Sequence, residues 1–241
     1  MRINKFLAEC HLGSRRKVET LVQEGLVTVN GIINKDFHTQ INTQSDIVLV
    51  DGKIIKHDPQ RIFLLMNKPS GYIVTKKDQF NRKTIYHLLP EFATKLNPIG
   101  RLDYDSEGLL LLTNDGEITN KITHPSFQIE KTYKVLVKGM VSQKKINQLR
   151  EGVPIEDYHT LPAKVFLKKT TPDSSEIRIS IMEGKNRQIR KMMEFIGHEV
   201  KLLKRLQIGD IKLEKIPLGS WRFLTDKEIL YLIKITKHKR T

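Results

Sequence analysis

The chain has 241 residues, of which 39% are hydrophobic and 29% are charged, and its formal net charge is +15. No apolar run approaches the ~20 residues that span a bilayer, the first residues lack the apolar segment of a secretion signal, and the single cysteine, Cys10, excludes an internal disulfide and a cysteine-based zinc cluster. We therefore expect a cytoplasmic protein without a membrane partner, long enough for a small domain followed by a larger one.

The basic excess predicts an anionic partner and is unevenly distributed. Residues 1–58 carry eight Lys and Arg against seven Asp and Glu, whereas residues 59–241 carry 34 against 20. Nucleic acid is the commonest partner of so basic a chain. The alternative, an anionic membrane surface, would need a basic amphipathic helix, and none stands out. The eight histidines have no metal-ligand spacing and no cofactor-binding loop is evident, so we expect neither a metal nor a cofactor.

Residues 1–58 predict two helices followed by short strands. Apolar residues recur at i, i+3, i+4 and i+7 from Ile3 to Cys10, which marks one face of a helix that Gly13 can end. Ser14 is a natural N-cap for a second helix, RRKVETLVQEG. Asn-Gly within LVTVNGII and Asp-Gly within DIVLVDGKII each predict a hairpin.

The first unit also carries a basic cluster, Arg15, Arg16 and Lys17, at the start of its second helix. This cluster is either a solvated helix end or a set of phosphate contacts, and the basic chain favours the contacts. The segment RINKFLAECHLGSRRKVETLVQEGLVTVNG resembles the small alpha-L (S4-like) RNA-binding domain. The resemblance implies that residues 1–58 form such a domain.

The segment KHDPQRI, which contains Pro59, reads as a linker to a larger domain over residues 59–241. Beyond it, FLLMNKPSGYIV predicts a strand, a turn and a second strand. Further strands are predicted in LLLLT, KTYKVLVKG, SSEIRISIMEG and EVKLLKRLQIG, and helices in GEITNKIT, SQKKINQLREG, NRQIRKMMEFIG and DKEILYLIKI, the last opened by a Thr225 and Glu228 capping box. Strands and helices do not alternate strictly, so the predicted fold class is α+β, with a mixed, mainly antiparallel sheet flanked by helices.

One stretch, GRLDYDSEGLLLLTNDGEI, has the alternating carboxylates of a calcium loop: Asp103, Asp105 and Glu107. An EF-hand loop requires a glutamate at its twelfth position, where Asn114 stands, and a helix on each side. The run of four leucines instead predicts a buried strand. The stretch is therefore a polar turn entering a core strand, or a turn whose carboxylate performs chemistry.

The longer segment PIGRLDYDSEGLLLLTNDGEI resembles the signature of the rRNA pseudouridine synthases of the RsuA/RluB/RluF type. NKPSGY, EKTYKV and EGKNRQIRKM match further segments of that family in the same order, so that with the alpha-L domain the resemblance covers essentially the whole chain. It implies that Asp103 is the catalytic carboxylate and that Tyr133 stacks on a flipped uracil and transfers a proton. It also implies that Arg190 pairs with Asp103.

The residues fit the chemistry that this resemblance implies, the isomerisation of uridine to pseudouridine. The reaction is redox-neutral, and a carboxylate can act as nucleophile or stabilise positive charge on the sugar. A cation within ~4–6 Å would keep that carboxylate ionised. Helix geometry cannot aim every cation of GKNRQIRK at one target. The other cations of this segment, Lys185, Arg187 and Lys191, therefore contact RNA phosphate or lie in solvent. We also expect an RNA contact from Arg101, and structural roles for Asp105, Ser106 and Glu107.

The expected partner is ribosomal RNA, as a free or partly assembled subunit, bound by a monomer. NRQIR and IPLGSWRFLT look closer to the large-subunit enzymes, which favours 23S rRNA. Two alternatives stay open: a non-catalytic RNA-binding ribosome-assembly factor on the same fold, and a metal-dependent phosphodiesterase or nuclease, for which the carboxylates and histidines lack ligand spacing. For Tyr133 the alternative is a core tyrosine on an amphipathic strand.

Overall fold

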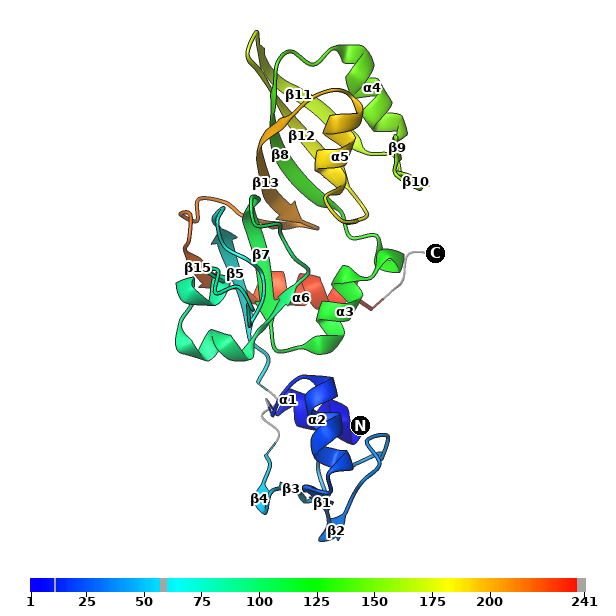
Figure 1. Ribbon diagram of the computed structural model, residues 1–241, viewed down its shortest axis with the longest axis vertical. Coiled ribbons are helices and arrows are strands. Elements are labelled where there is room, and N and C mark those ends of the chain that lie inside the picture. Colours follow the sequence, from blue (N-terminus) through cyan, green and yellow to red (C-terminus); the bar gives the residue numbers. More distant parts are fainter. Residues whose placement is uncertain (11, 57–59, 238–241) are drawn as a thin grey trace. The chain divides into compact units, whose positions relative to one another are not determined.

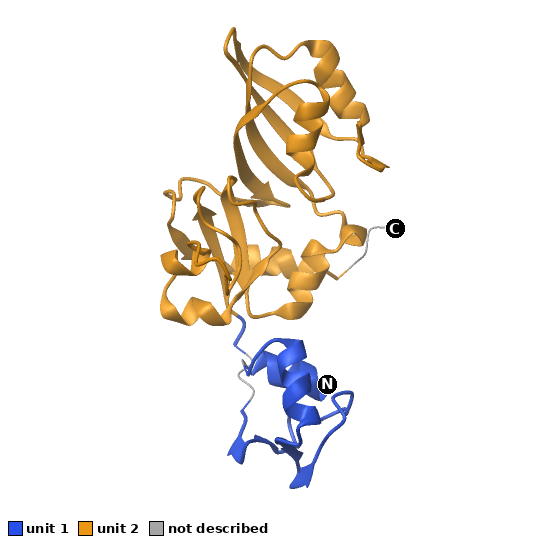
Figure 2. Cartoon of the chain, in the orientation of Figure 1, with its two compact units in different colours: residues 1–61 blue, residues 62–241 orange. Residues whose placement is uncertain are grey.

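The chain forms two compact units, residues 1–61 and 62–241, in a computed structural model that describes residues 1–10, 12–56 and 60–237 (Figures 1 and 2). The predicted boundary between residues 58 and 59 falls on residues outside the described part. Each unit has its own hydrophobic core, one in the first unit and two in the second. Among the described residues, no helix is both long enough and apolar enough to cross a bilayer.

In the first unit, residues 1–10, 12–56, 60 and 61 form two helices and a four-stranded antiparallel sheet in the order β2-β1-β3-β4. Its elements are α1 (Ile3–Glu9), α2 (Arg15–Gln23), β1 (Val27–Val29), β2 (Ile32–Ile33), β3 (Val48–Val50) and β4 (Lys53–Ile54). The Ser14 side chain accepts a hydrogen bond from the Lys17 N–H at 3.3 Å, which confirms the predicted cap. Both predicted hairpins are also confirmed, because the Asn-Gly and Asp-Gly pairs take the positive φ that such turns require.

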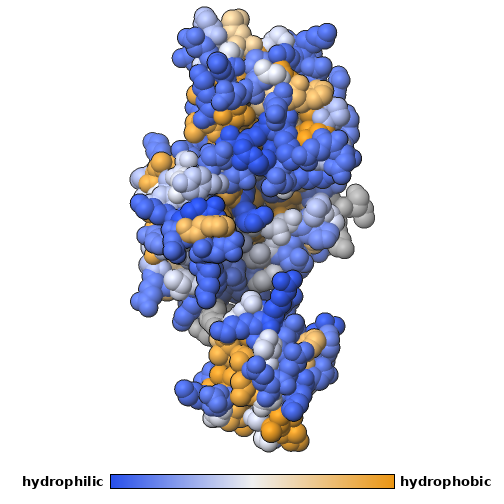
Figure 3. Space-filling view, viewed as in Figure 1, coloured by the Kyte–Doolittle hydropathy of each residue, from blue (hydrophilic) through white to orange (hydrophobic). Residues whose placement is uncertain are grey.

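The core of the first unit lies between the apolar faces of the two helices and the sheet. Ile3 and Leu7 of α1 and Val18 and Val22 of α2 are fully buried there. Figure 3 shows apolar side chains on the visible surface of this unit. Its most exposed isoleucines are Ile32, Ile33, Ile47 and Ile54.

The second unit is built on one large sheet in the order β11-β12-β8-β13-β7-β5-β15, with β14 paired to β13 and β6 to β7. Its strands are β5 (Phe63–Lys68), β6 (Asn97–Ile99), β7 (Glu107–Thr113), β8 (Lys131–Lys138), β11 (Lys164–Thr171), β12 (Ser174–Ile181), β13 (Val200–Ile208), β14 (Ile211–Lys212) and β15 (Trp221–Phe223). A separate two-stranded sheet joins β9 (Pro154–Ile155) and β10 (Tyr158–His159). Strands β13 and β7 run parallel and the other strand pairs of the large sheet are antiparallel, which confirms the predicted mixed, mainly antiparallel sheet.

Four α-helices and three short 3₁₀ helices complete the described part of the second unit. They are α3 (Gly116–Thr123), α4 (Gln143–Glu151), α5 (Gln188–Phe195), α6 (Asp226–Ile235), η1 (Ile85–Leu88), η2 (Glu91–Lys95) and η3 (Pro125–Phe127). The predicted capping box of α6 is confirmed. The Thr225 side chain accepts from the Glu228 N–H at 3.3 Å, and the Glu228 carboxylate accepts from the Thr225 N–H at 2.8 Å.

The four-leucine run forms the buried centre of β7, as predicted. Leu110 and Leu112 belong to one core, whereas Leu109 and Leu111 face the other core, which includes residues of α3 and α6. A strand buried on both faces is apolar at every position rather than at alternate ones. Full burial of each leucine stabilises the fold by about 1.5–3 kcal/mol, so β7 firmly anchors the polar loop that precedes it.

Two predictions for this unit need correction. The second strand expected in YIV does not form; Ile73 makes only an isolated bridge to Thr84. The two edge strands of the sheet, β11 and β15, were not predicted from the sequence. An edge strand is paired with a neighbouring strand along one edge only. In β11 only Val165 is fully buried, so the alternation of hydrophobic and polar residues that marks a strand is weak there.

Candidate active site

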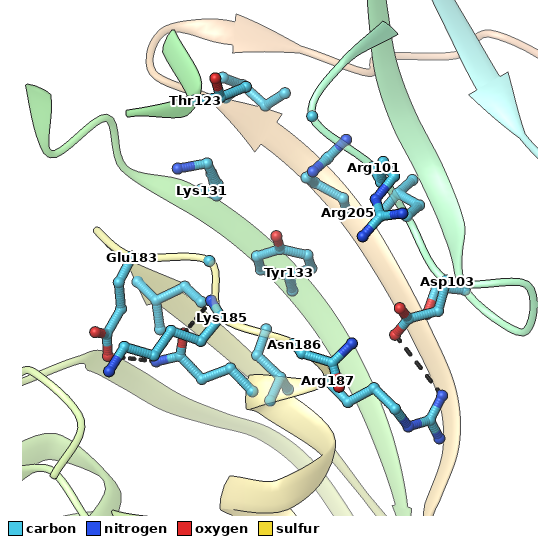
Figure 4. A pocket seen from close by; sticks show the side chains of 18 of the residues that line it. Arg101, Asp103, Thr123, Lys131, Tyr133, Glu183, Lys185, Asn186, Arg187 and Arg205 are labelled. Carbon is cyan, nitrogen blue, oxygen red and sulfur yellow. Dashed lines mark hydrogen bonds and ion pairs between the residues drawn. The ribbon is translucent and has the colours of Figure 1, made fainter. Parts of the chain in front are cut away.

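A cavity of about 680 Å³ opens in the second unit, over the face of strands β8 and β13 (Figure 4). Three of the four conspicuous sequence motifs line it. GRLDYDSEG contributes Asp103, EKTYKV contributes Tyr133, and EGKNRQIRKM contributes Arg187. The fourth motif, NKPSGY, contributes Lys68, whose side chain donates hydrogen bonds to the backbone of the loop that carries Asp103. Segments far apart in the sequence therefore meet at one site.

Asp103 lies on the loop between β6 and β7, whose backbone is fixed by specific contacts. The loop begins at Gly100, where φ is +74°, a conformation that glycine adopts without strain. The Ser106 N–H donates to the Asp103 carbonyl at 3.1 Å, and the Gly71 N–H donates to the Tyr104 carbonyl at 2.8 Å. These bonds close a turn and tie it to the NKPSGY segment. The half-buried Asp103 carboxylate is thereby presented to the cavity.

Lys68, the last residue of β5, holds this loop with a buried ammonium group. Its side chain is 0% exposed. Its Nζ donates to the carbonyls of Ser106 (2.8 Å), Pro69 (3.0 Å) and Asp103 (3.0 Å), and the carbonyl of Tyr104 lies 3.5 Å away, where it can share one of the three N–H groups. Burial lowers the pKa of Lys68 to about 8, although the carboxylates of Asp105 and Asp103 oppose that shift. A lysine is seldom buried without partners, and here the partners are the backbone of the loop that carries Asp103.

Two arginines reach the loop from the start of α5, and their pairing differs from the prediction. Arg187 Nη1 lies 3.8 Å from Asp103 Oδ2 and 3.5 Å from Asp105 Oδ1. Arg190, which we expected to pair with Asp103, instead has its Nη2 3.1 Å from Asp105 Oδ1. The same Nη2 donates to the Asp105 carbonyl at 3.0 Å and to Ser106 Oγ at 3.4 Å.

The backbone at the start of α5 explains this division. Arg187 precedes the helix in a left-handed conformation, with φ +49°, and its side chain extends to the cavity edge beside Asp103 (Figure 4). Arg190 sits in the first turn of the helix and packs against the loop backbone, with 13% of its side chain exposed compared with 46% for Arg187. Asp105 serves as an anchor for Arg190, in line with the structural role expected for it.

The floor of the cavity carries Tyr133 and two cations that the sequence analysis did not single out, Lys131 and Arg205. Tyr133 is 7% exposed and Arg205 is 3% exposed. Arg205 Nε donates to the Leu109 carbonyl at 2.7 Å, while its buried Nη2 has no hydrogen-bond partner. Lys131 Nζ donates to the Ile129 carbonyl at 3.0 Å. Burial, and secondly the charge of Arg205, lower the pKa of Lys131 to about 8.

A signal for both missed cations is present in the sequence. Lys131 precedes Tyr133 by two positions in one strand, so the two side chains point to the same face of the sheet. Arg205 follows Leu203 by two positions, and both are buried in β13. An arginine that shares the inward face of a strand with a buried leucine marks a buried cation that needs a role.

The other residues predicted to contact RNA occupy several places. Arg101 and Lys185 are exposed and line the cavity, with Lys185 Nζ 3.3 Å from the centroid of the Tyr158 ring. Lys191 pairs with Glu156 at 2.9 Å. Arg15, Arg16 and Lys17 are exposed at the start of α2 in the first unit. Their contacts with RNA stay predictions.

The site thus combines one carboxylate at the cavity edge, a buried aromatic ring and several cations. Such a set can hold a flat, anionic or nucleotide-like molecule, with the carboxylate directed at a carbon that develops positive charge. Within residues 1–10, 12–56 and 60–237, no group of three or more His, Cys, Asp or Glu side chains is arranged to hold a metal ion.

Comparison with known families identifies matches to both units. Residues 62–195 match the family described as RNA pseudouridylate synthase, and residues 1–43 match the S4 domain. Together the two matches cover most of the chain and include Asp103, Tyr133 and Arg190.

Similar proteins extend over nearly the full length. The ribosomal large subunit pseudouridine synthase B of Bacillus subtilis (strain 168) is 40% identical over 243 residues, covering 98% of this chain and 97% of its own. The dual-specificity RNA pseudouridine synthase RluF of Escherichia coli (strain K12) is 36% identical over 240 residues, covering 99% and 80%. A crystal structure of a pseudouridylate synthase superposes with a TM-score of 0.70 at 31% identity, covering 96% of this chain and 99% of that one.

Proposed function

The chain belongs to the RNA pseudouridylate synthase family, and from this premise we propose that it converts a specific uridine of ribosomal RNA, in the 23S molecule, to pseudouridine. That it is an isomerase acting on RNA follows from the family. The ribosomal substrate is supported by the 40% identity to a relative named for the large ribosomal subunit. In this proposal the protein acts as a cytoplasmic monomer on free or partly assembled subunits, with Asp103 and Tyr133 performing the chemistry.

The observation that carries the catalytic assignment is the meeting of Asp103 and Tyr133 in one cavity. A base cannot react inside a helical stack and must be extruded into a pocket. A flipped base stacks on aromatic rings, and Tyr133 offers such a ring on the cavity floor. Asp103, at the cavity edge, would then face the sugar. Arg187, 3.8 Å from that carboxylate, supplies positive charge beside it.

The reaction balances with these residues alone. The C1′–N1 bond breaks and its electron pair goes to N1, while the Asp103 carboxylate bonds to C1′ or stabilises its positive charge. The uracil turns and C5 bonds to C1′; where Asp103 had bonded to C1′, that bond breaks and its electron pair returns to the carboxylate. The proton on C5 then leaves and N1 gains a proton. The Tyr133 hydroxyl is a suitable carrier for that proton transfer.

The basic surface would bind the phosphates of the RNA. Residues 1–43 match the S4 domain, and the exposed Arg15, Arg16 and Lys17 of that unit are its proposed phosphate contacts. At the cavity, Arg101 and Lys185 are exposed and placed for phosphates flanking the flipped nucleotide. Binding that neutralises phosphates weakens steeply with salt, which makes this part of the proposal measurable.

The test is single-turnover release of tritium from rRNA labelled at C5 of uridine. Asp103→Asn should reduce the rate by roughly 10³-fold or more, because a neutral amide replaces the group that meets the sugar. Asp210→Asn removes an exposed carboxylate in the turn between β13 and β14 and is the matched control, with a rate near that of wild type. An Asp103→Asn enzyme that retains more than a few per cent of the rate would show that another group is the nucleophile.

The ribosomal target is tested separately. Pseudouridines in 16S and 23S rRNA are mapped in cells with and without the gene, and the proposal expects the loss of a 23S position. Loss of a 16S position, or of a tRNA position alone, would overturn the assignment to 23S while leaving the enzyme class intact.

A further inference from the structure

The floor of the cavity carries positive charge that no carboxylate in the described part of the chain neutralises. Lys131 and Arg205 line the cavity, and neither has an ion-pair partner among the described residues. The two carboxylates in the lining are engaged elsewhere. Asp103 faces Arg187, and Glu183 accepts from the Leu161 N–H and from the Gln188 side chain. An uncompensated buried cation is costly, so this pair is built to meet an anion or an electron-rich group.

The position of the pair relative to Tyr133 indicates what that group is. Arg205 and Tyr133 are Cα partners on the adjacent antiparallel strands β13 and β8, and the Cβ atoms of such partners lie about 4.5–5.5 Å apart. Lys131 stands two residues before Tyr133, on the same face of β8 and roughly 6.5 Å away along the strand. Figure 4 shows Lys131 and Tyr133 rising from β8 and Arg205 from β13. A base stacked on Tyr133 therefore lies within reach of both cations.

Burial favours the base over a phosphate as the group that meets Arg205. Arg205 is 3% exposed and its Nη2 is buried without a partner, whereas the backbone phosphates of a flipped nucleotide stay toward the cavity mouth. The exposed Arg101 and Lys185 are better placed for those phosphates. The base enters deepest, and its O2 and O4 are the acceptors that a guanidinium and an ammonium can bind.

Resting on the proposed function, we propose that Arg205, assisted by Lys131, binds the carbonyl oxygens of the flipped uracil and stabilises the negative charge that develops on the base. When the C1′–N1 bond breaks, the electron pair passes to N1 and is delocalised onto O2 and O4. Asp103 meets the positive sugar, and the two cations meet the negative base. Donors fixed where charge develops in a water-poor site contribute roughly 10²–10³-fold to rate.

The experiment compares chemistry and binding in three variants of the full-length protein. Arg205→Met removes the charge while keeping much of the side-chain volume, Arg205→Lys keeps the charge, and Lys131→Met tests the second cation. Arg178→Met, which removes an exposed arginine from β12, is the matched control for loss of one charge. Single-turnover rates at saturating enzyme should fall about 10²-fold or more for Arg205→Met, less for Lys131→Met, and recover in part with Arg205→Lys. The Kd for RNA should change less than threefold, with an unchanged salt slope.

A second substrate separates charge stabilisation from a purely structural role. Fluorine at C5 withdraws electrons and stabilises the anionic base, so RNA carrying 5-fluorouridine at the target needs less help from the protein. Because C5 carries fluorine in place of a proton, the rearranged base keeps the fluorine and adds water across N1 and C6, and this product is read by chromatography of the digested nucleosides. The defect of Arg205→Met should be at least tenfold smaller on this substrate than on uridine.

Each contrary outcome has a distinct meaning. An equal defect on both substrates would assign Arg205 a structural role and overturn the inference. A weaker Kd with a salt slope reduced by about 0.9 would identify a phosphate contact instead. If Arg205→Met fails to fold, Arg205→Gln, which also removes the charge, and Lys131→Met carry the same substrate comparison. Failure of the wild-type protein to form pseudouridine would refute the proposed function itself, whereas variants as fast as an active wild type would refute only this inference.

Discussion

Replacing Lys68 with methionine should slow pseudouridine formation about 100-fold and leave RNA binding nearly unchanged. The ammonium of Lys68 lies within 3.0 Å of the carbonyls of Pro69, Asp103 and Ser106, and the side chain is fully buried. Methionine has a similar length but no donor, so all three carbonyls lose their partner. The loop that carries Asp103 would then relax away from its position, and a misplacement of about 1 Å at a reacting group can cost roughly 10²-fold in rate.

The loss of folding stability in the Lys68→Met variant follows from the same hydrogen bonds. Three hydrogen bonds from a charged donor contribute about 1.5–3 kcal/mol each, or about 4.5–9 kcal/mol together. Burial of the ammonium opposes this. A pKa lowered from 10.5 to about 8 corresponds to about 3 kcal/mol at 1.36 kcal/mol per pKa unit. The net loss in the variant is therefore smaller than the sum of the three hydrogen bonds, and much of it should appear as local disorder of the loop rather than as global unfolding.

The pH dependence of stability isolates the buried ammonium. The pKa of Lys68 is lower in the folded protein than in the unfolded chain, so the unfolded chain binds more protons between pH 8 and 10.5. The wild type therefore gains stability from Lys68 as the pH rises through that window. The Lys68→Met variant lacks that gain, so the difference in unfolding free energy should widen by up to about 3 kcal/mol from pH 8 to 10.5. Urea titrations of both proteins across this range measure it.

The assay for chemistry is single-turnover tritium release at saturating enzyme, with RNA affinity measured in parallel. Lys144→Met, which removes an exposed lysine from α4, is the matched control. A Lys68→Met rate within threefold of wild type would show that the ammonium does not hold the loop. A loss of affinity with a shallower salt dependence would place Lys68 against RNA phosphate, contrary to its burial.

Three further predictions follow from other contacts. Tyr133→Phe should keep RNA affinity, because the ring still stacks on the base and such stacking contributes roughly 1–3 kcal/mol per base. The variant should form product more slowly, and a near-normal single-turnover rate would show that the Tyr133 hydroxyl carries no proton. Gly108→Ala should destabilise the protein by at least about 2 kcal/mol in urea titrations, because its Cβ would clash with the Arg205 backbone and φ is +106°. Gly116→Ala, which has open space, should be neutral or slightly stabilising, and equal effects of the two would contradict the argument. Removing residues 1–61 should raise the enzyme concentration needed for half-maximal single-turnover rate and make RNA affinity depend less steeply on salt, while the maximal rate stays the same. A lower maximal rate at an unchanged half-saturating concentration would mean that this unit helps to assemble the active site.

Local features of the fold could be predicted because their causes are local. Asn-Gly and Asp-Gly turns, the Ser14 cap and the Thr225 capping box depend on a few adjacent residues. The four-leucine strand is marked by its own composition. Strands that form only because another strand lies beside them were harder to predict. YIV looks like a strand but has no ladder to join, and β11 is a strand because β12 lies beside it.

The residues that form the site could largely be predicted from the sequence, but the ion pairs between them could not. Asp103 and Tyr133 lie in the same cavity, as their motifs implied. The partner of Asp103 could not be predicted, because Arg187 and Arg190 both lie within reach of one short loop and the choice depends on the direction from which α5 approaches. Arg205 could be predicted as buried from its period-two spacing, but its place beside Tyr133 requires that β13 pair with β8.

The parallel contact between β7 and β13 links the two ends of the proposed chemistry. Gly108 lies opposite Arg205 in this pair, so closely that only a glycine fits, and Arg205 Nε donates to the carbonyl of Leu109, the next residue. The loop that presents Asp103 enters β7 just before this contact, and Arg205 belongs to the strand that forms it. In the proposed mechanism, the carboxylate at the sugar and the cation at the base are therefore fixed relative to each other by the same few backbone atoms. A strand-to-strand contact that has no catalytic atoms of its own therefore sets the spacing of the two charged groups, so that the bound RNA has only to deliver the nucleotide between them.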